Sequence, residues 1–165
     1  MIKYKMELID IKINLTYALA PTMIIEINND KVYHQKIATD TIAVQSTVPT
    51  GDWQMKITHI GKNYEINNDE FFEIQDIFLN DVPIGHMIWN TTQIPLDVSE
   101  SEISQHNWEG NLYFGHNAHC VWNFTSPVEK MLRDFYNTNQ SKTINAQETT
   151  RKTLDYMKQK FQITN

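Results

Sequence analysis

Histidine and cysteine side chains gather near residue 118 and are the first candidates for chemistry in this chain. His116, His119 and Cys120 could imitate a zinc-binding set, and a Cys–His pair could supply a nucleophile with its base. In a strand, however, positions 116 and 119 point to opposite faces of the sheet. Cys120 alternates with Trp122 and Phe124, which is typical of a small residue facing the core. No nucleophile elbow, phosphate loop, dinucleotide fingerprint or zinc protease motif occurs, so we expect a protein that is not an enzyme.

Carboxylates and amides gather at predicted turns, and their oxygen atoms are the ligands that calcium prefers. The calcium candidates are Asp76, Asn80 and Asp81. Asn and Asp are also favoured in turns for their backbone conformation alone. Two interpretations therefore stay open: a bound calcium ion, or ordinary turn residues and no cofactor.

A sugar-binding site is a further possibility, because tryptophan rings offer flat apolar faces with a polar edge. Trp89 and Trp108 flank a polar, serine-rich loop at about 91–105, and His116 and Asn117 follow in the next turn. Aromatic residues of a β-sandwich are more often part of its core. The four residues are thus either a glycan platform or packing residues.

The elements that must position these side chains are strands. Apolar residues alternate with polar ones from Ile9 to Phe124, which is the period of half-buried strands. Asn28-Asn29-Asp30 and Asn80-Asp81 predict tight hairpin turns. We therefore expect a mainly β protein, an antiparallel β-sandwich or jelly roll over residues 1–126. Its predicted core residues are Ile11, Ile13, Ile25, Met55, Ile57, Trp122 and Phe124.

Two strand pairs are predicted in the second half of the sandwich. Phe72–Leu79 is expected to pair with Ile84–Trp89, and Gly110–Gly115 with Cys120–Phe124. Helices are expected only after Ser126, where Ser is a good N-cap and the proline that follows suits the first helical position.

A helical extension is predicted over residues 127–165. It comprises a short helix at about 127–136, a polar linker at about 137–145 and a helix at about 146–161. The second helix shows only a narrow apolar stripe of Leu154, Met157 and Phe161. Because an isolated helix of that length is marginal in water, we expect this arm to dock on another protein molecule.

Composition and charge exclude several classes. The chain has 165 residues with 14 Lys and Arg against 20 Asp and Glu, a net charge of −6, which disfavours nucleic-acid binding. No apolar run approaches the length of a membrane span, so no membrane partner is expected. The first seven residues interleave charged with apolar side chains and lack a signal-peptide core, which indicates synthesis in a cytoplasm.

Two segments carry a resemblance to a known family. Residues 107–118 read Asn-Trp-Glu-Gly-Asn-Leu-Tyr-Phe-Gly-His-Asn-Ala, and residues 121–128 read Val-Trp-Asn-Phe-Thr-Ser-Pro-Val. Together they resemble the closing segment of small β-sandwich structural proteins of tailed bacteriophages, especially contractile-tailed phages of marine bacteria. That family in turn resembles calcium-dependent xylan-binding modules. The likeness covers about residues 10–136, and it departs from the family at Ala118 and His116, where a glycine and an aromatic residue would stand.

The resemblance implies a non-enzymatic virion protein that acts as an adaptor, a capsid decoration or a tail-associated subunit. It would be made in the host cytoplasm and would bind other virion proteins, as a homo-oligomer or in several copies per particle. The alternative is a carbohydrate-binding module that attaches the virion to a glycan of the host surface. The calcium and sugar ligands of the xylan-binding modules do not carry over residue by residue.

Overall fold

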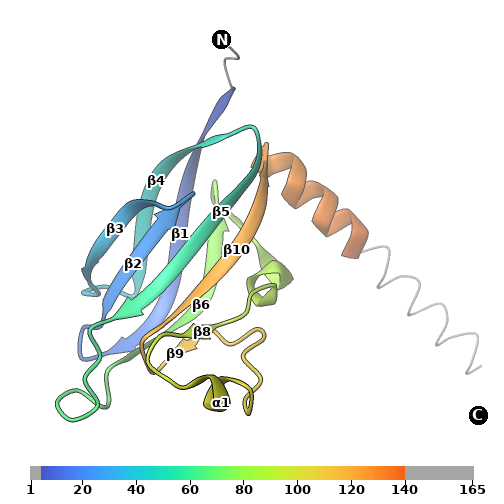
Figure 1. Ribbon diagram of the computed structural model, residues 1–165. Helices are drawn as coiled ribbons and strands as arrows, with labels where there is room; N and C mark the ends of the chain where they lie inside the picture. Colours follow the sequence, from blue (N-terminus) through green and yellow to red (C-terminus); the bar gives the residue numbers. More distant parts are fainter. Residues whose placement is uncertain (1–4, 140–165) are drawn as a thin grey trace, which may run out of the picture. The chain divides into compact units, whose positions relative to one another are not determined.

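The computed structural model describes residues 5–139, and ten strands dominate this part of the chain (Figure 1). Their bounds are β1 Met6–Ala18, β2 Thr22–Ile27, β3 Asp30–Lys36, β4 Thr41–Pro49, β5 Gly51–Ile60, β6 Phe71–Leu79, β7 Val82–Pro83, β8 Ile94–Pro95, β9 Tyr113–Phe114 and β10 Ala118–Ser126. A 3-10 helix η1 covers Gly85–Trp89, a short helix α1 covers Glu100–Ile103, and a further helix covers 128–139. The chain divides into two units, Met1–Glu129 and Lys130–Asn165.

The first unit is an antiparallel β-sandwich, as the alternation predicts. One sheet has the order β4-β1-β6-β7, with β9 also paired to β6, and the other has the order β3-β2-β5-β10-β8. Every strand pair is antiparallel. No helix in the described part of the chain is long and apolar enough to cross a lipid bilayer.

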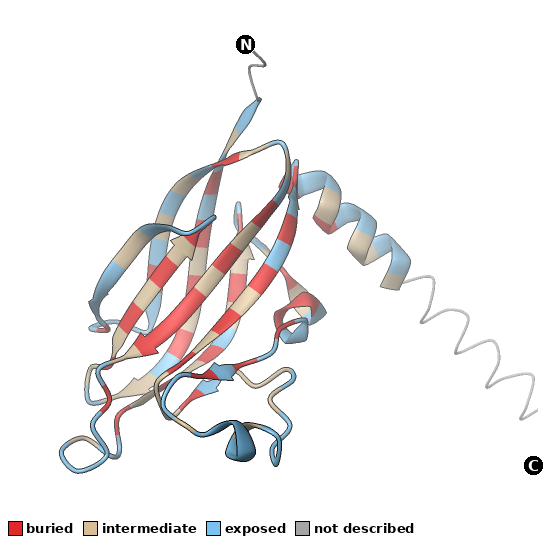
Figure 2. Cartoon of the chain, in the orientation of Figure 1, coloured by how far each residue is buried: buried red, intermediate tan, exposed pale blue. Residues whose placement is uncertain are grey.

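The core lies between the inner faces of the two sheets. Buried and exposed positions alternate along the long strands (Figure 2). All seven predicted core residues are at most 2% exposed, which confirms their assignment to the inner faces. Aromatic rings of the core pack across neighbouring strands: Phe72 stacks on Phe114 at 4.4 Å between ring centroids, and the Trp53 ring lies 4.8 Å from the Phe124 ring.

Both predicted hairpin turns are present. Asn28 and Asn29 have φ angles of 51° and 69°, and Asn80 and Asp81 have φ angles of 51° and 62°. Two successive positive φ angles define the turn that matches the twist of adjacent strands, and Asn and Asp tolerate this backbone conformation.

The predicted strand at Ile84–Trp89 is wrong, because only Val82–Pro83 pairs with β6 and residues 85–89 form η1. Gly85 has a φ angle of 56°, which ends the strand and turns the chain. Ile84, Met87 and Ile88 are buried at helical spacing rather than at alternate positions.

Three further expectations need correction. The strand predicted at Gly110–Gly115 is reduced to β9, which pairs with β6 and not with β10. Helix α1 precedes Ser126, where no helix was expected; Ser99 and Glu102 form a capping box that starts it. The helix predicted at about 127–136 covers 128–139, three residues further than expected into the predicted linker.

Candidate functional site

Trp89 is the one tryptophan of the four whose side chain is more than half exposed, at 54%. It is the last residue of η1, and the carbonyl oxygen of the preceding residue, Ile88, accepts a hydrogen bond from Trp122 Nε1 at 2.9 Å. Because Trp122 is itself buried in the core, this bond fixes the end of η1 against β10. The His86 ring lies 5.6 Å from the Trp89 ring on the same short helix. Trp89 is therefore a rigidly mounted aromatic face at the surface.

The segment that follows Trp89 is fastened to β10 and to the chain near residue 110. Thr91 Oγ1 donates to the Val121 carbonyl oxygen at 2.8 Å and accepts from the Val121 N–H at 3.1 Å. The Gly110 N–H donates to the Thr91 carbonyl oxygen at 2.8 Å. Gly110 has a φ angle of 64°, and a Cβ atom there would contact Trp89 at 3.5 Å. That distance is an ordinary contact, so the backbone conformation rather than lack of space favours a glycine beside Trp89.

Polar side chains surround this aromatic face. Thr92 and Glu109 are directly opposite partners in an isolated antiparallel bridge, so their side chains project to the same side. The side chains of Asn90, Thr92 and Glu109 are exposed, and none of them has a hydrogen-bond partner among residues 5–139. Asn123 accepts from Gln54 Nε2 at 3.2 Å, which leaves its own amide N–H groups available.

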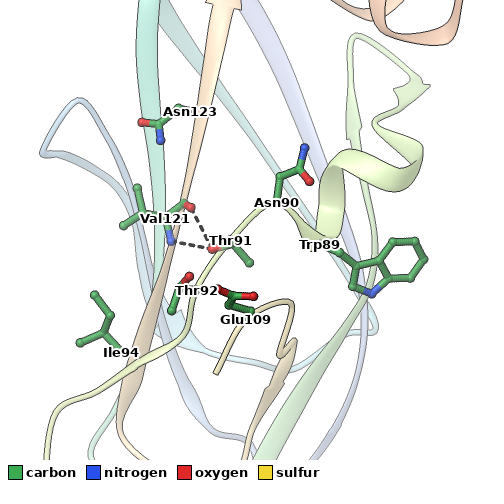
Figure 3. Close-up of a pocket in the computed structure, with 8 residues that line it drawn as sticks. All are labelled: Trp89, Asn90, Thr91, Thr92, Ile94, Glu109, Val121 and Asn123. Carbon is green, nitrogen blue, oxygen red and sulfur yellow. Dashed lines mark hydrogen bonds between the residues drawn. The ribbon is translucent and has the colours of Figure 1, made fainter. Parts of the chain in front are cut away.

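These residues line a groove of about 470 Å³, within the usual size range of small-molecule sites. In Figure 3, Trp89 lies at one end, Asn123 and Ile94 lie at the other, and Thr92 and Glu109 lie between them. The lining residues are Trp89, Asn90, Thr91, Thr92, Ile94, Glu109, Val121 and Asn123. An exposed ring face beside amide, hydroxyl and carboxylate groups can bind a molecule that has both apolar faces and hydroxyl groups.

Of the four glycan candidates, only Trp89 lies in this groove. Trp108 is half-buried; its Nε1 donates to the Ile103 carbonyl oxygen at 3.0 Å, and its ring packs edge-on against His116 at 5.1 Å. Asn117 joins two loops, because its amide bonds both to the backbone of Lys62 and to Asp97. Trp108, His116 and Asn117 therefore contact protein groups instead of sharing a surface with Trp89.

His116 is held as a neutral packing residue. Burial lowers its pKa below the usual 6.5; the Asp97 carboxylate opposes this effect, while Lys62 and His59 add to it. Its Nε2 is buried with no hydrogen-bond partner in the described part of the chain. The neutral ring suits its edge-on contact with Trp108.

A buried polar cluster near His116 is the second group of residues that could carry chemistry. His59 is completely buried; its Nε2 lies 3.0 Å from Glu70 Oε1 and its Nδ1 lies 3.0 Å from the His116 carbonyl oxygen. Glu70 Oε2 accepts from Asn67 Nδ2 at 2.6 Å. Lys62 Nζ donates to two carbonyl oxygens, those of residues 68 and 70, at 2.7 Å each.

A His–Glu pair can act as a general base, but both ring nitrogens of His59 are engaged by protein atoms and the ring is shielded from solvent. Burial lowers the Lys62 pKa, while Glu70, Asp69 and Asp97 raise it. The Lys62 ammonium group donates hydrogen bonds to two carbonyl oxygens of the loop and so holds them together. This cluster therefore holds the 61–70 loop in place and presents no reactive atom to a substrate.

Each of the three calcium candidates has a protein partner. Asp76 Oδ1 accepts from the Ile77 N–H at 2.8 Å, at a bulge where the register of β6 against β1 shifts. Asn80 Oδ1 accepts from the Asp10 N–H at 2.9 Å, and Asp81 lies 3.8 Å from Lys12 Nζ. Within residues 5–139, no three His, Cys, Asp or Glu side chains converge on a point. Calcium binding by Asp76, Asn80 and Asp81 stays a prediction.

Cys120 is completely buried, with Sγ 3.5 Å from the Asn111 carbonyl oxygen. Burial raises its pKa to about 12, against smaller opposing contributions from Thr91 and Gln93. The thiol is therefore protonated at neutral pH, and it behaves as the small core residue that the alternation predicts.

The sequence interpretation missed Asn90, Thr92, Glu109 and Asn123. The run Trp89-Asn90-Thr91-Thr92 contains a signal, since a tryptophan followed by three polar residues is unusual for a core strand. Glu109 and Asn123 carry no such signal, because only the Thr92–Glu109 bridge and the β10 hydrogen bonds bring them to Trp89.

Comparisons with known proteins find distant likenesses among solved structures. The structure of vCBM60 in complex with galactobiose has a TM-score of 0.48 and 6% sequence identity, and the match covers 71% of this chain and 99% of that one. The selenomethionine form of vCBM60, described with two families of calcium-dependent carbohydrate-binding modules, has a TM-score of 0.48 and 9% identity over 69% and 89% of the two chains. No family model and no curated protein matches the chain.

The predicted partner-binding residues Leu154, Met157 and Phe161 lie outside the described residues. Their role in docking on another protein molecule stays a prediction.

Proposed function

We propose that the protein is a non-catalytic carbohydrate-binding module and that it binds a glycan in the groove beside Trp89. One observation carries this proposal: Trp89, which is 54% exposed, lines a groove with Asn90, Thr92 and Glu109, whose side chains have no hydrogen-bond partner among residues 5–139. Sugar rings have apolar C–H faces and hydroxyl edges. The indole would pack against such a face, and the free amide, hydroxyl and carboxylate groups would bond the hydroxyls.

The groove favours a sugar over a protein partner. A protein-docking surface needs a continuous apolar patch that a partner covers. Here the groove exposes two apolar side chains, Trp89 and Ile94. Polar lining residues lie between them, so they do not form a continuous apolar patch. Such a mixture of one aromatic face and several convergent polar groups is typical of a small-molecule site.

Replacing Trp89 by alanine should weaken binding at least about tenfold, because a central tryptophan supplies much of the contact energy at such sites. The wild type should be retarded in native gels that contain the polysaccharide it binds, and calorimetry with the matching oligosaccharide would give the dissociation constants. Because Trp89 is exposed, the melting temperature of the variant should stay close to that of the wild type.

Tyr64→Ala is the matched control, since Tyr64 is 47% exposed and is not a lining residue of the groove. It should bind the polysaccharide as the wild type does. Equal losses in the two variants would mean that the contact with sugar is not at Trp89. No retardation of the wild type by any of a broad set of plant, algal and bacterial polysaccharides would refute glycan binding itself.

The virion location, with binding to other virion proteins through the segment beyond 146, stays a prediction from the resemblance. It is compatible with glycan binding, because a particle can carry a sugar-binding module on its surface. If the prediction holds, mass spectrometry of purified particles of a phage whose genome encodes this chain should detect the protein. Absence of the protein from such particles would rule out the virion location.

A further inference from the structure

The charge of the groove bears on which glycan it accepts. Of the eight lining residues, only Glu109 is ionisable, and it is negative. Three basic residues adjoin the lining without belonging to it: the His86 ring packs beside Trp89, and Lys56 and His119 lie opposite Val121 and Ile94 in the sheet. The Lys56 charge is paired with Glu26 at 2.7 Å. The whole chain also carries a net charge of −6. A ligand in this groove therefore meets one carboxylate and no cation from the lining.

Glu109 differs from the carboxylates that are paired with a basic side chain. Glu26 lies 2.7 Å from Lys56 Nζ, Glu70 lies 3.0 Å from His59 Nε2, and Asp134 lies 2.6 Å from Lys130 Nζ. The Glu109 carboxylate has no such partner within residues 5–139. Its backbone is nevertheless fixed, because its N–H donates to Asn107 Oδ1 at 3.0 Å and its chain pairs with Thr92.

A carboxylate and an exposed tryptophan that line one groove can together bind an organic ammonium group. The ammonium is attracted to the π-face of the ring and donates charge-assisted hydrogen bonds to the carboxylate. A carboxylate-bearing sugar meets the opposite situation, since its charge would lie beside Glu109 with no cation to offset it.

From this combination we propose that the groove selects glycans that carry a free amine, that is, de-N-acetylated amino sugars, and rejects uronic and sialic acids. The inference rests on the proposed glycan binding and adds to it a specificity residue, Glu109. Asn90 and Asn123 would bond hydroxyl groups of either kind of sugar, and so would not discriminate between them.

Three probes of equal length test the inference by calorimetry at about pH 6, where an aliphatic amine is protonated. They are β-1,4-linked oligomers of glucosamine, the same oligomers in N-acetylated form, and oligomers of galacturonate. The wild type should bind the glucosamine oligomer at least about fivefold more tightly than its acetylated form, as expected for one charge-assisted contact. It should not bind the galacturonate oligomer.

Glu109→Gln should remove this preference while keeping the shape of the groove. Glu65→Gln is the matched control: Glu65 is exposed and outside the groove, and its N–H donates to Asn63 Oδ1 just as that of Glu109 donates to Asn107. Glu65→Gln should leave the ratio of affinities unchanged. Equal losses in both variants would mean that the amine is attracted only by the bulk charge, and would overturn the inference.

The two proposals fail in different ways. Equal affinity of the wild type for the amine and the N-acetyl oligomer, or binding of neutral polysaccharides through Trp89 without binding of the amine oligomer, would overturn the amine preference alone. Failure of every polysaccharide and all three oligomers to bind would refute the proposed function together with it.

Discussion

Trp122→Ala should lower the free energy of unfolding by about 3–5 kcal/mol, the usual cost of deleting a buried tryptophan. Trp122 is 1% exposed on the inner face of β10, opposite Met55 of β5. Its removal leaves a cavity between the sheets and also leaves the Ile88 carbonyl oxygen, which accepts from Trp122 Nε1, without that donor. Chemical denaturation of the variant and the wild type under the same conditions measures the difference.

Trp122→Phe separates the two contributions. It retains most of the apolar volume and loses only the bond to Ile88, so it should cost about 1–3 kcal/mol. It should also weaken glycan binding more than its effect on stability suggests, because that bond holds the end of η1 and hence Trp89. A loss below about 1 kcal/mol for Trp122→Ala would show that the facing of β10 is misassigned.

Glu70→Ala should be the second large loss, about 3 kcal/mol, because it leaves the buried His59 Nε2 without its hydrogen-bond partner and removes a carboxylate that offsets the charge of the buried Lys62. Glu70 accepts from both His59 and Asn67, and the side chains of His59 and Glu70 are 0% and 11% exposed. The variant should also expose the 61–70 loop to proteolysis, since the Glu70 side chain ties this loop to β5.

Glu65→Ala is the control for this experiment, because it removes an exposed carboxylate from the same loop. It should change the free energy of unfolding by less than about 0.5 kcal/mol. If Glu70→Ala is as mild as Glu65→Ala, the buried cluster does not hold the loop, and its polar groups need another explanation.

The sequence predicts the sandwich because its long strands obey one simple rule. A strand that buries one face repeats its apolar side chains every two residues, as Ile9, Ile11 and Ile13 do in β1. The Asn-Asn and Asn-Asp turns are equally readable, because few residues accept two positive φ angles in succession. Neither rule depends on contacts between distant parts of the chain.

Where short elements are decided by distant contacts, the same rules fail. The apolar residues of the Ile84–Trp89 segment predict a strand. Gly85 instead turns the chain, and a hydrogen bond from Trp122, over thirty residues away, fixes the end of η1. β9 is only two residues long, and it pairs with β6 rather than with β10, which follows it in the sequence. Such pairings depend on tertiary packing rather than on local sequence.

The candidate site shows the same division. Trp89 was recognisable from its residue type, but Trp108, His116 and Asn117 were grouped with it only because they are close in sequence or similar in kind. The fold instead places Glu109 and Asn123 in the same groove as Trp89, through the bridge to Thr92 and the bonds between Thr91 and Val121. A groove made from three separate segments cannot be predicted from spacing along one of them.

Native gels identify the polysaccharide that retards the protein most strongly. Nuclear magnetic resonance titration with the matching oligosaccharide then tests the glycan-binding groove most directly. The proposed site predicts that the indole N–H signal of Trp89 and the side-chain amide signals of Asn90 and Asn123 shift in proportion to ligand occupancy. The indole signals of the buried Trp53 and Trp122 should stay close to their original positions. Saturable shifts confined to residues outside the groove, with the Trp89 signal unmoved, would contradict glycan binding beside Trp89.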